Sequence, residues 1–95
     1  MQTQTHVPTE SGQLYLKKLC RHFAHKVPAT VTGDQGIIEF PFGRCLIDTT
    51  EAYMHFRVDV GDDSQVPTAE RVIGEHLQRM APAEKLEINW QRGEA

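Results

Sequence analysis

Three side chains in the first third of the chain are of types that bind transition metals. Cys20, His22 and His25 form the pattern Cys-x-His-x-x-His, and thiolate and imidazole are common zinc ligands. The local pattern predicts a helix, on which the two histidines are neighbours while Cys20 points roughly 140–160° away from them. We therefore consider a metal site of His22 and His25, completed by His55 or a carboxylate. The alternative is two solvated histidines, which the C-terminal end of a helix stabilises when they are charged.

His76 lies near the middle of the apolar side of a second predicted helix. It has three interpretations: a core histidine bonded to a backbone carbonyl, a buried functional base tuned toward neutral pH by its surroundings, and a residue at a subunit interface. The chain has neither a nucleophile-elbow motif nor a phosphate-binding glycine loop. The sequence therefore identifies no catalytic residues, and an enzyme is the less favoured class.

A proline between two phenylalanines is the most unusual local sequence of the chain. Phe40, Pro41 and Phe42 are followed by Gly43 and Arg44, and proline makes this segment rigid and interrupts a strand. One interpretation is a ligand or partner surface, at which Arg44 holds a carboxylate or phosphate in its planar fork. The other is a β-bulge that lets the sheet curve around the helices.

The clearest strand pattern covers residues 53–60, where apolar and polar side chains alternate strictly. Such a pattern predicts an antiparallel strand with one buried face and one open face. The inward residues are Met54, Phe56, Val58 and Val60. We expect the open face to carry a ligand or partner surface. Its candidate residues, including those of the proline segment, are Phe40, Phe42, Arg44, Tyr53, His55 and Arg57.

The remaining elements must position these side chains. Apolar residues at helical spacing predict helices over residues 13–26, with Thr9 or Ser11 as the N-cap, and over residues 68–80. Strands are expected at residues 3–7 (a short edge strand), 29–32, 37–40, 44–49, 53–60 and 85–91. The last of these strands would alternate Leu86, Ile88 and Trp90 inward.

The order of these elements, (β)-α-β-β-β-β-α-β, predicts the α+β class. The simplest architecture is a curved antiparallel sheet with two helices packed on one face. The order looks like half of the TATA-binding-protein saddle plus one strand, as an analogy of topology. We expect a single domain over residues 1–95, frayed at residues 1–5 and 93–95.

Composition excludes several classes of protein. The 95 residues carry 10 Lys and Arg against 13 Asp and Glu, a net charge of −3, which disfavours nucleic acid as a partner. No apolar run approaches the roughly 18–20 residues of a membrane span, and the chain does not start with a secretory signal. With only two cysteines, we expect reduced thiols packed in the core and a cytoplasmic location. The sequence identifies no cofactor.

Three segments carry a family resemblance: Leu19 to Pro28 with His-Phe-Ala-His-Lys, Ile38 to Cys45 with Glu-Phe-Pro-Phe-Gly-Arg-Cys, and Glu75 to Ala81. With these motifs the chain resembles the bacterial family known as domain of unknown function 2218, over nearly its whole length. The resemblance implies a small bacterial domain without an established activity or agreed catalytic residues. It also implies an association with siderophore-interacting and iron-uptake proteins.

The leading functional hypothesis is a non-enzymatic binding or interaction domain that uses the open sheet face. The partner would be a protein, a small molecule or a second copy of the chain, since dimerisation extends a thin core. One alternative is an accessory role in iron or siderophore handling, which follows from the family resemblance. Another is a small enzyme that depends on His76 or on the pair His22 and His25.

Overall fold

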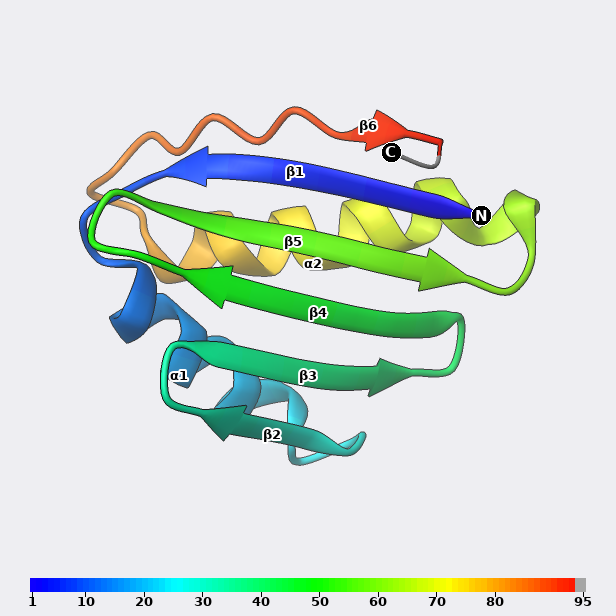
Figure 1. The fold of residues 1–95 in the computed structure, drawn as a ribbon, viewed down its shortest axis with the longest axis horizontal. Coiled ribbons are helices and arrows are strands. Elements are labelled where there is room, and N and C mark those ends of the chain that lie inside the picture. Colours follow the sequence, from blue (N-terminus) through cyan, green and yellow to red (C-terminus); the bar gives the residue numbers. More distant parts are fainter. Residues whose placement is uncertain (94–95) are drawn as a thin grey trace.

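The computed structural model describes residues 1–93 and consists of one sheet and two helices (Figure 1). The elements are, in chain order, β1 (Gln2–Pro8), α1 (Gly12–Phe23), β2 (Ala29–Thr32), β3 (Gln35–Phe40), β4 (Gly43–Thr49), β5 (Tyr53–Val60), the short 3-10 helix η1 (Asp63–Gln65), α2 (Val66–Met80) and β6 (Gln91–Arg92). The predicted α+β class and order of elements are confirmed.

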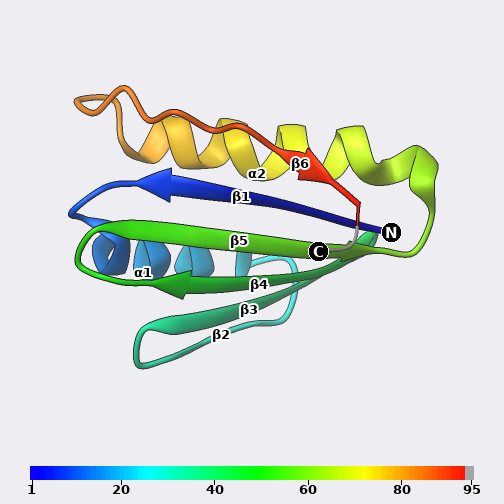
Figure 2. The same cartoon turned by 45° about the horizontal axis from the view of Figure 1, so that its top comes forward.

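The sheet has six strands in the order β2-β3-β4-β5-β1-β6, and every neighbouring pair is antiparallel. Strands β2 to β5 follow one another as hairpins, and β1 joins them along the free side of β5. Both helices lie on the same face, α1 against β2 to β4 and α2 against β5 and β1 (Figures 1 and 2). Within residues 1–93, no element covers the other face of the sheet.

The covered face holds the core. Met54, Phe56 and Val58 of β5 are fully buried, as their alternation predicts, and they meet the apolar side of each helix. Helix α1 lies close to the sheet at Gly36, where an added Cβ would be 2.6 Å from Cδ1 of Leu16. A glycine at this position of β3 therefore lets the helix approach.

Both predicted helices are present with shifted ends. Helix α1 ends at Phe23 instead of residue 26, because the amides of Lys26 and Val27 both donate to the Phe23 carbonyl in a closing turn ahead of Pro28. Ser11 occupies the N-cap position but its side chain makes no capping bond. Helix α2 begins at Val66, two residues before the predicted start, with Pro67 in its first turn.

The prediction for the start of the chain was wrong in two respects. Residues 2–5, expected to be frayed, belong to β1, and Thr3 and Thr5 are buried. Strand β1 is also not an edge strand, because it lies between β5 and β6. Its partner β5 is about 50 residues away in the chain, with Gln2 opposite Asp59. The predicted frayed residues 94 and 95 lie outside the described residues.

The predicted strand over residues 85–91 was also wrong in extent. Only Gln91 and Arg92 pair with β1, and residues 85–90 form no ladder. Leu86 is nevertheless buried, and Ile88 and Trp90 pack against the core as predicted. The alternation comes from an extended segment lying with one side on the core. Such contact imposes a two-residue period without ladder hydrogen bonds.

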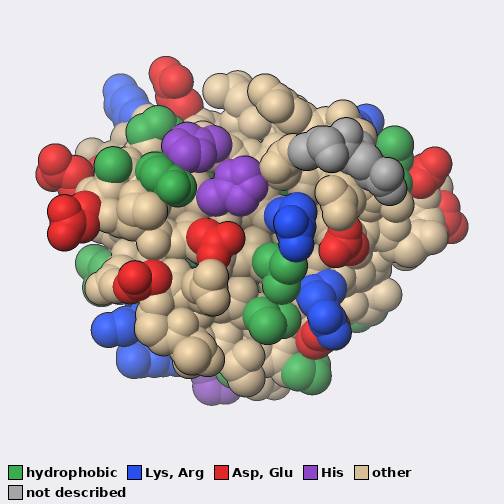
Figure 3. Space-filling model, in the orientation of Figure 1, with side chains coloured by type: hydrophobic (Ala, Val, Ile, Leu, Met, Phe, Trp, Pro, Cys, Tyr) green, Lys and Arg blue, Asp and Glu red, His purple; other side chains and the backbone are tan. Residues whose placement is uncertain are grey.

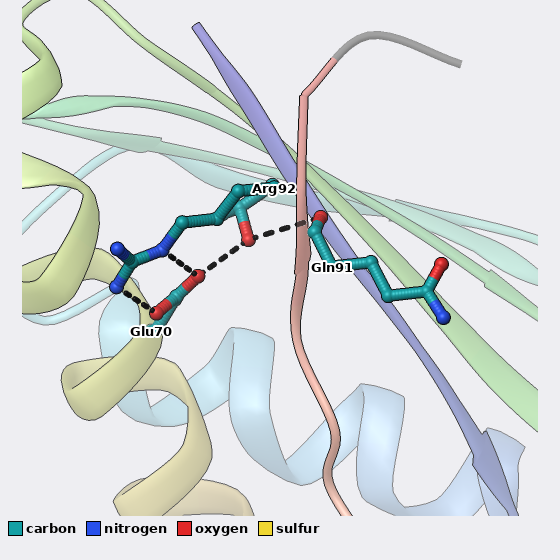
Figure 4. A network of polar contacts seen from close by, with 4 residues as sticks. Glu70, Gln91 and Arg92 are labelled. Atoms are coloured by element: carbon teal, nitrogen blue, oxygen red, sulfur yellow. Dashed lines mark hydrogen bonds and ion pairs between the residues drawn. The ribbon is translucent and has the colours of Figure 1, made fainter.

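The carboxylates of Glu70 and Glu84 form hydrogen bonds that hold the C-terminal segment, residues 84–92, against the rest of the fold. Glu70 of α2 accepts from Arg92 at 2.8 and 3.1 Å and from the hydroxyl of Thr3 at 2.6 Å (Figure 4). Glu84 accepts from the hydroxyls of Thr9, at 2.9 Å, and Tyr15. The bond to Glu84 raises the pKa of Tyr15, and burial adds to the effect.

Candidate functional site

The open face of the sheet carries rows of side chains that cross several strands, because facing residues in adjacent strands project to the same side. Figure 3 shows this face, where histidine, acidic and basic side chains lie side by side. One row runs over five strands and consists of Thr32, Gln35, Asp48, His55 and His6. The next row consists of Thr30, Ile37, Leu46, Arg57, Gln4 and Gln91.

The first row brings histidines and an acid together. The rings of His6 and His55 are 6.0 Å apart, and His6 lies 4.1 Å from the ring of Tyr53, both measured between centroids. Asp48 faces His55 in the register and accepts a 2.7 Å hydrogen bond from the Gln35 amide. His6 was not among the predicted surface residues, because it was expected near a loose end of the chain.

Two hollows occupy this face and share part of their lining. The more enclosed one has a volume of about 350 Å³, with an aliphatic floor that includes Ile37 and Leu46. Its polar lining consists of Thr30, Thr32, Gln35, Asp48 and Arg57. The wider and shallower one, about 630 Å³, is lined by His6, His55 and Tyr53, among others. The volumes are in the range of small-molecule sites.

The two predicted arginines of this face differ in their contacts. Arg44 donates to Glu39, its neighbour across the strand pair, at 2.6 Å. Arg57 has no carboxylate within ion-pair distance among residues 1–93. The guanidinium of Arg57 is thus available to a ligand, whereas that of Arg44 is already held by its own chain.

Phe40 and Phe42 do not lie with the other predicted surface residues. Phe40 continues the inward alternation of β3, and its ring stacks on that of Phe42 with centroids 4.7 Å apart. On its other side it meets Phe23 of α1 at 4.8 Å. The predicted surface is therefore divided: Arg44, Tyr53, His55 and Arg57 face outward, and the two phenylalanines pack on the helix side.

The proline segment is a tight hairpin turn, where the sequence suggested a bulge. Phe40 pairs with Gly43, so Pro41 and Phe42 are the two loop residues between β3 and β4. Gly43 has φ +156, and an added Cβ would lie 1.9 Å from the carbonyl oxygen of Asp59. Glycine is required here because β5 passes directly beside the turn.

His22 and His76 meet at the edge of this aromatic cluster. Their ring centroids are 5.0 Å apart, and Phe23 lies 4.9 Å from His76. Nδ1 of His76 is 2.6 Å from the Val72 carbonyl oxygen, the backbone bond that the sequence suggested, although His76 is only half-buried. Partial loss of hydration lowers the pKa of His22, and electrostatic repulsion from His76, Lys26, His25 and Arg79 lowers it further.

The structure separates His55 from the predicted metal ligands. His22 and His25 belong to α1 and the turn that follows it, on the helix side, whereas His55 faces outward from β5. No group of three or more His, Cys, Asp or Glu residues within residues 1–93 is arranged to hold a metal ion. A site at His22 and His25 would thus need ligands from outside this part of the chain.

Comparison with known proteins places the chain in a family. A family model described as an uncharacterised protein conserved in bacteria, DUF2218, matches residues 4–91. The chain belongs to this family. An NMR structure of PA4090 from Pseudomonas aeruginosa is similar to it, with 33% identity and a TM-score of 0.81 over 99% of this chain and 98% of that one. No curated protein matches the chain.

In this DUF2218 domain both cysteines are free and buried, as expected from the sequence. Burial raises the pKa of each thiol, and for Cys45 the nearby Cys20 adds to the effect. A raised pKa leaves little thiolate, which is the reactive form. Neither cysteine is therefore suited to be a nucleophile in the folded domain.

Several residues around the smaller hollow were not predicted from the sequence of this DUF2218 domain. Thr30, Thr32, Gln35 and Asp48 each occupy an outward position of a strand. The two-residue period assigns each one to the open face, which is a signal present in the sequence. Their convergence depends on the register between strands, which no single strand encodes.

No helix among the described residues is long and apolar enough to cross a membrane.

Proposed function

We propose that this protein is a non-catalytic binding domain that uses the open face of its sheet to hold a small molecule. The smaller hollow carries the proposal. It combines an aliphatic floor with the guanidinium of Arg57, which forms no ion pair among residues 1–93, and binding sites are typically apolar surfaces with a few placed polar groups.

The positions of His22 and His76 argue against the histidine-dependent enzyme that the sequence suggested as an alternative. His76 has its Nδ1 directed at a backbone carbonyl, and the ring of His22 lies beside it on the helix side of the sheet. Neither histidine lines the hollows of the open face. A general base needs a substrate within hydrogen-bond reach, and the hollows offer that reach to His6 and His55 instead.

The role implied by the family resemblance and the expected cellular location are both compatible with a binding domain. The iron- or siderophore-related role that the family resemblance implies is one that a binding domain could serve, and none of the contacts above selects it. Two buried free thiols also support a cytoplasmic location.

NMR titration of the isotope-labelled domain tests the proposal. A panel of organic acids, amines, amino acids, sugars and nucleosides would be added while backbone amide shifts are followed. We expect at least one compound class to shift amides of the open face around Ile37, Leu46 and Arg57. Shifts confined to the helices, or none with any compound, would contradict the proposal.

A second copy of the chain is the competing occupant of this face. Light scattering distinguishes it, because a dimer has twice the monomer mass of 10.8 kDa. A small-molecule binding domain should remain a monomer at the concentrations used for NMR. A dimer that is lost on replacing Arg57 or Ile37 would assign the face to self-association instead.

A further inference from the structure

We propose that the smaller hollow of the open face binds a small zwitterion with an aliphatic body, such as a free aliphatic amino acid. This inference rests on the proposed binding function and names its ligand class. It follows from the charges that line the hollow, from its floor and from its size.

Two opposite charges line the hollow without neutralising one another. Arg57 and Asp48 both contribute to its lining, yet they are not within ion-pair distance of each other. One oxygen of Asp48 accepts from Gln35, and the other has no hydrogen-bond partner among residues 1–93. A ligand with a carboxylate and an ammonium group would satisfy both side chains, whereas a simple anion would lie beside the Asp48 carboxylate.

The aliphatic floor lies beside both charges. Leu46 faces Arg57 on one side and Ile37 on the other, and Asp48 is two residues along the same strand face. Ile37 is 39% exposed, one of the few large apolar side chains left open to solvent. An aliphatic ligand body would cover it and gain roughly 25 cal/mol for each Å² of apolar surface removed from water.

The size and the neutral polar groups limit the ligand further. A volume of about 350 Å³ is near the lower end for ligand pockets, which favours a single amino acid over a larger compound. Thr30 and Thr32 also line the hollow. A hydroxyl both donates and accepts, so the two threonines suit a ligand that presents a cation and an anion.

The test compares L-leucine with three analogues by NMR titration: isocaproate, which lacks the ammonium group, isoamylamine, which lacks the carboxylate, and N-acetyl-leucinamide, which lacks both charges. We expect leucine to shift the amides of the hollow. Each analogue should bind about tenfold more weakly or worse, as expected when one charge-assisted contact is lost.

Two variants test which side chain contacts each charged group of the ligand. Arg57→Gln should weaken leucine about tenfold and leave isoamylamine unchanged, and Asp48→Asn should weaken leucine similarly and leave isocaproate unchanged or tighter. Arg44→Gln and Asp59→Asn are matched controls, since both lie on the same face outside the hollow lining. They should bind leucine like the wild type.

The outcomes separate this inference from the function on which it rests. If leucine and its analogues bind alike, or if the control variants weaken leucine as much, the zwitterion assignment is wrong. If leucine fails to bind while another compound shifts the open face, the assignment is wrong and the binding function stands. If no compound of the panel shifts that face, both are wrong.

Discussion

The two faces of the sheet are made by the same strands and have opposite roles. In β5, Phe56 is fully buried beneath the helices, while the adjacent Arg57 is exposed and has no ion-pair partner among the described residues. The covered face supplies the apolar burial that dominates folding stability. The open face carries polar side chains that do not contribute to the core. It is therefore the face on which a ligand can be recognised.

The comparison predicts that substitutions on the two faces separate into effects on stability and effects on binding. Unfolding in urea measures the effects on stability.

Truncation of an apolar side chain should be far more costly on the covered face. Phe56→Ala removes a fully buried ring and should lower the free energy of unfolding by about 3–5 kcal/mol. Ile37→Ala, the matched change on the open face, should cost less than about 1 kcal/mol because Ile37 is already 39% exposed. Equal losses would mean that the open face is not free of a structural role.

Glu70 should be the most important carboxylate for stability on the helix side. It accepts from Arg92 and from buried Thr3, so Glu70→Gln should cost about 1.5–3 kcal/mol. Glu75→Gln is the control on the same helix. Its exposed pair with Arg79 has a contact of 4.0 Å, so the change should cost less than about 0.5 kcal/mol.

The same contact predicts a pH dependence. The hydrogen bond from Arg92, followed by that from Thr3, lowers the pKa of Glu70 against the opposing effect of burial. A lowered pKa in the folded state stabilises the fold above the unfolded value of about 4.3, and this contribution is lost as pH falls through the folded-state pKa. The stability difference between wild type and Glu70→Gln should therefore shrink in acid. A difference that grows in acid would contradict this sign.

Two buried threonines of β1 should respond in opposite directions. Thr3 donates to Glu70 at 2.6 Å, whereas the Thr5 hydroxyl is buried without a hydrogen-bond partner among the described residues. Thr3→Val should cost about 1–3 kcal/mol, and Thr5→Val should leave stability unchanged or raise it by about 1 kcal/mol. Destabilisation by both changes would show that Thr5 has a partner, such as an ordered water.

Arg57→Gln should have the smallest effect on stability. The side chain is exposed and forms no ion pair among residues 1–93, so the free energy of unfolding should stay within about 0.5 kcal/mol of the wild type. A larger loss would show that folding uses the guanidinium, and it would weaken the division between the two faces.

The fold was largely predictable because alternation and helical spacing are local signals. Strand β5 has the predicted limits, since each side chain from Tyr53 to Val60 obeys a two-residue period. The extended segment with Leu86, Ile88 and Trp90 has the same period, yet only Gln91 and Arg92 after it pair with β1. Alternation in the sequence predicts which side of a segment is buried. It does not predict whether another strand pairs with the backbone of that segment.

The candidate site was predictable only in part. The outward positions of Arg44, Tyr53, His55 and Arg57 follow from strand periodicity. The inward packing of Phe42 against Phe40 depends on a tight turn that closes the hairpin. The contacts of Glu70 and Glu84 join residues far apart in the chain, and such pairings leave no local mark.

The position of β1 within the sheet has a consequence for the order of folding. Strands β2 to β5 form a meander of local hairpins. Strand β1 instead pairs with β5, from which α1 and strands β2 to β4 separate it in the chain. Closing that long loop is entropically costly and slow relative to hairpin formation. We therefore expect the meander with α1 to form first, and β1, α2 and the Glu70 contact to complete the domain late. Partly folded molecules would expose the free side of β5, an unpaired edge that could pair with another chain.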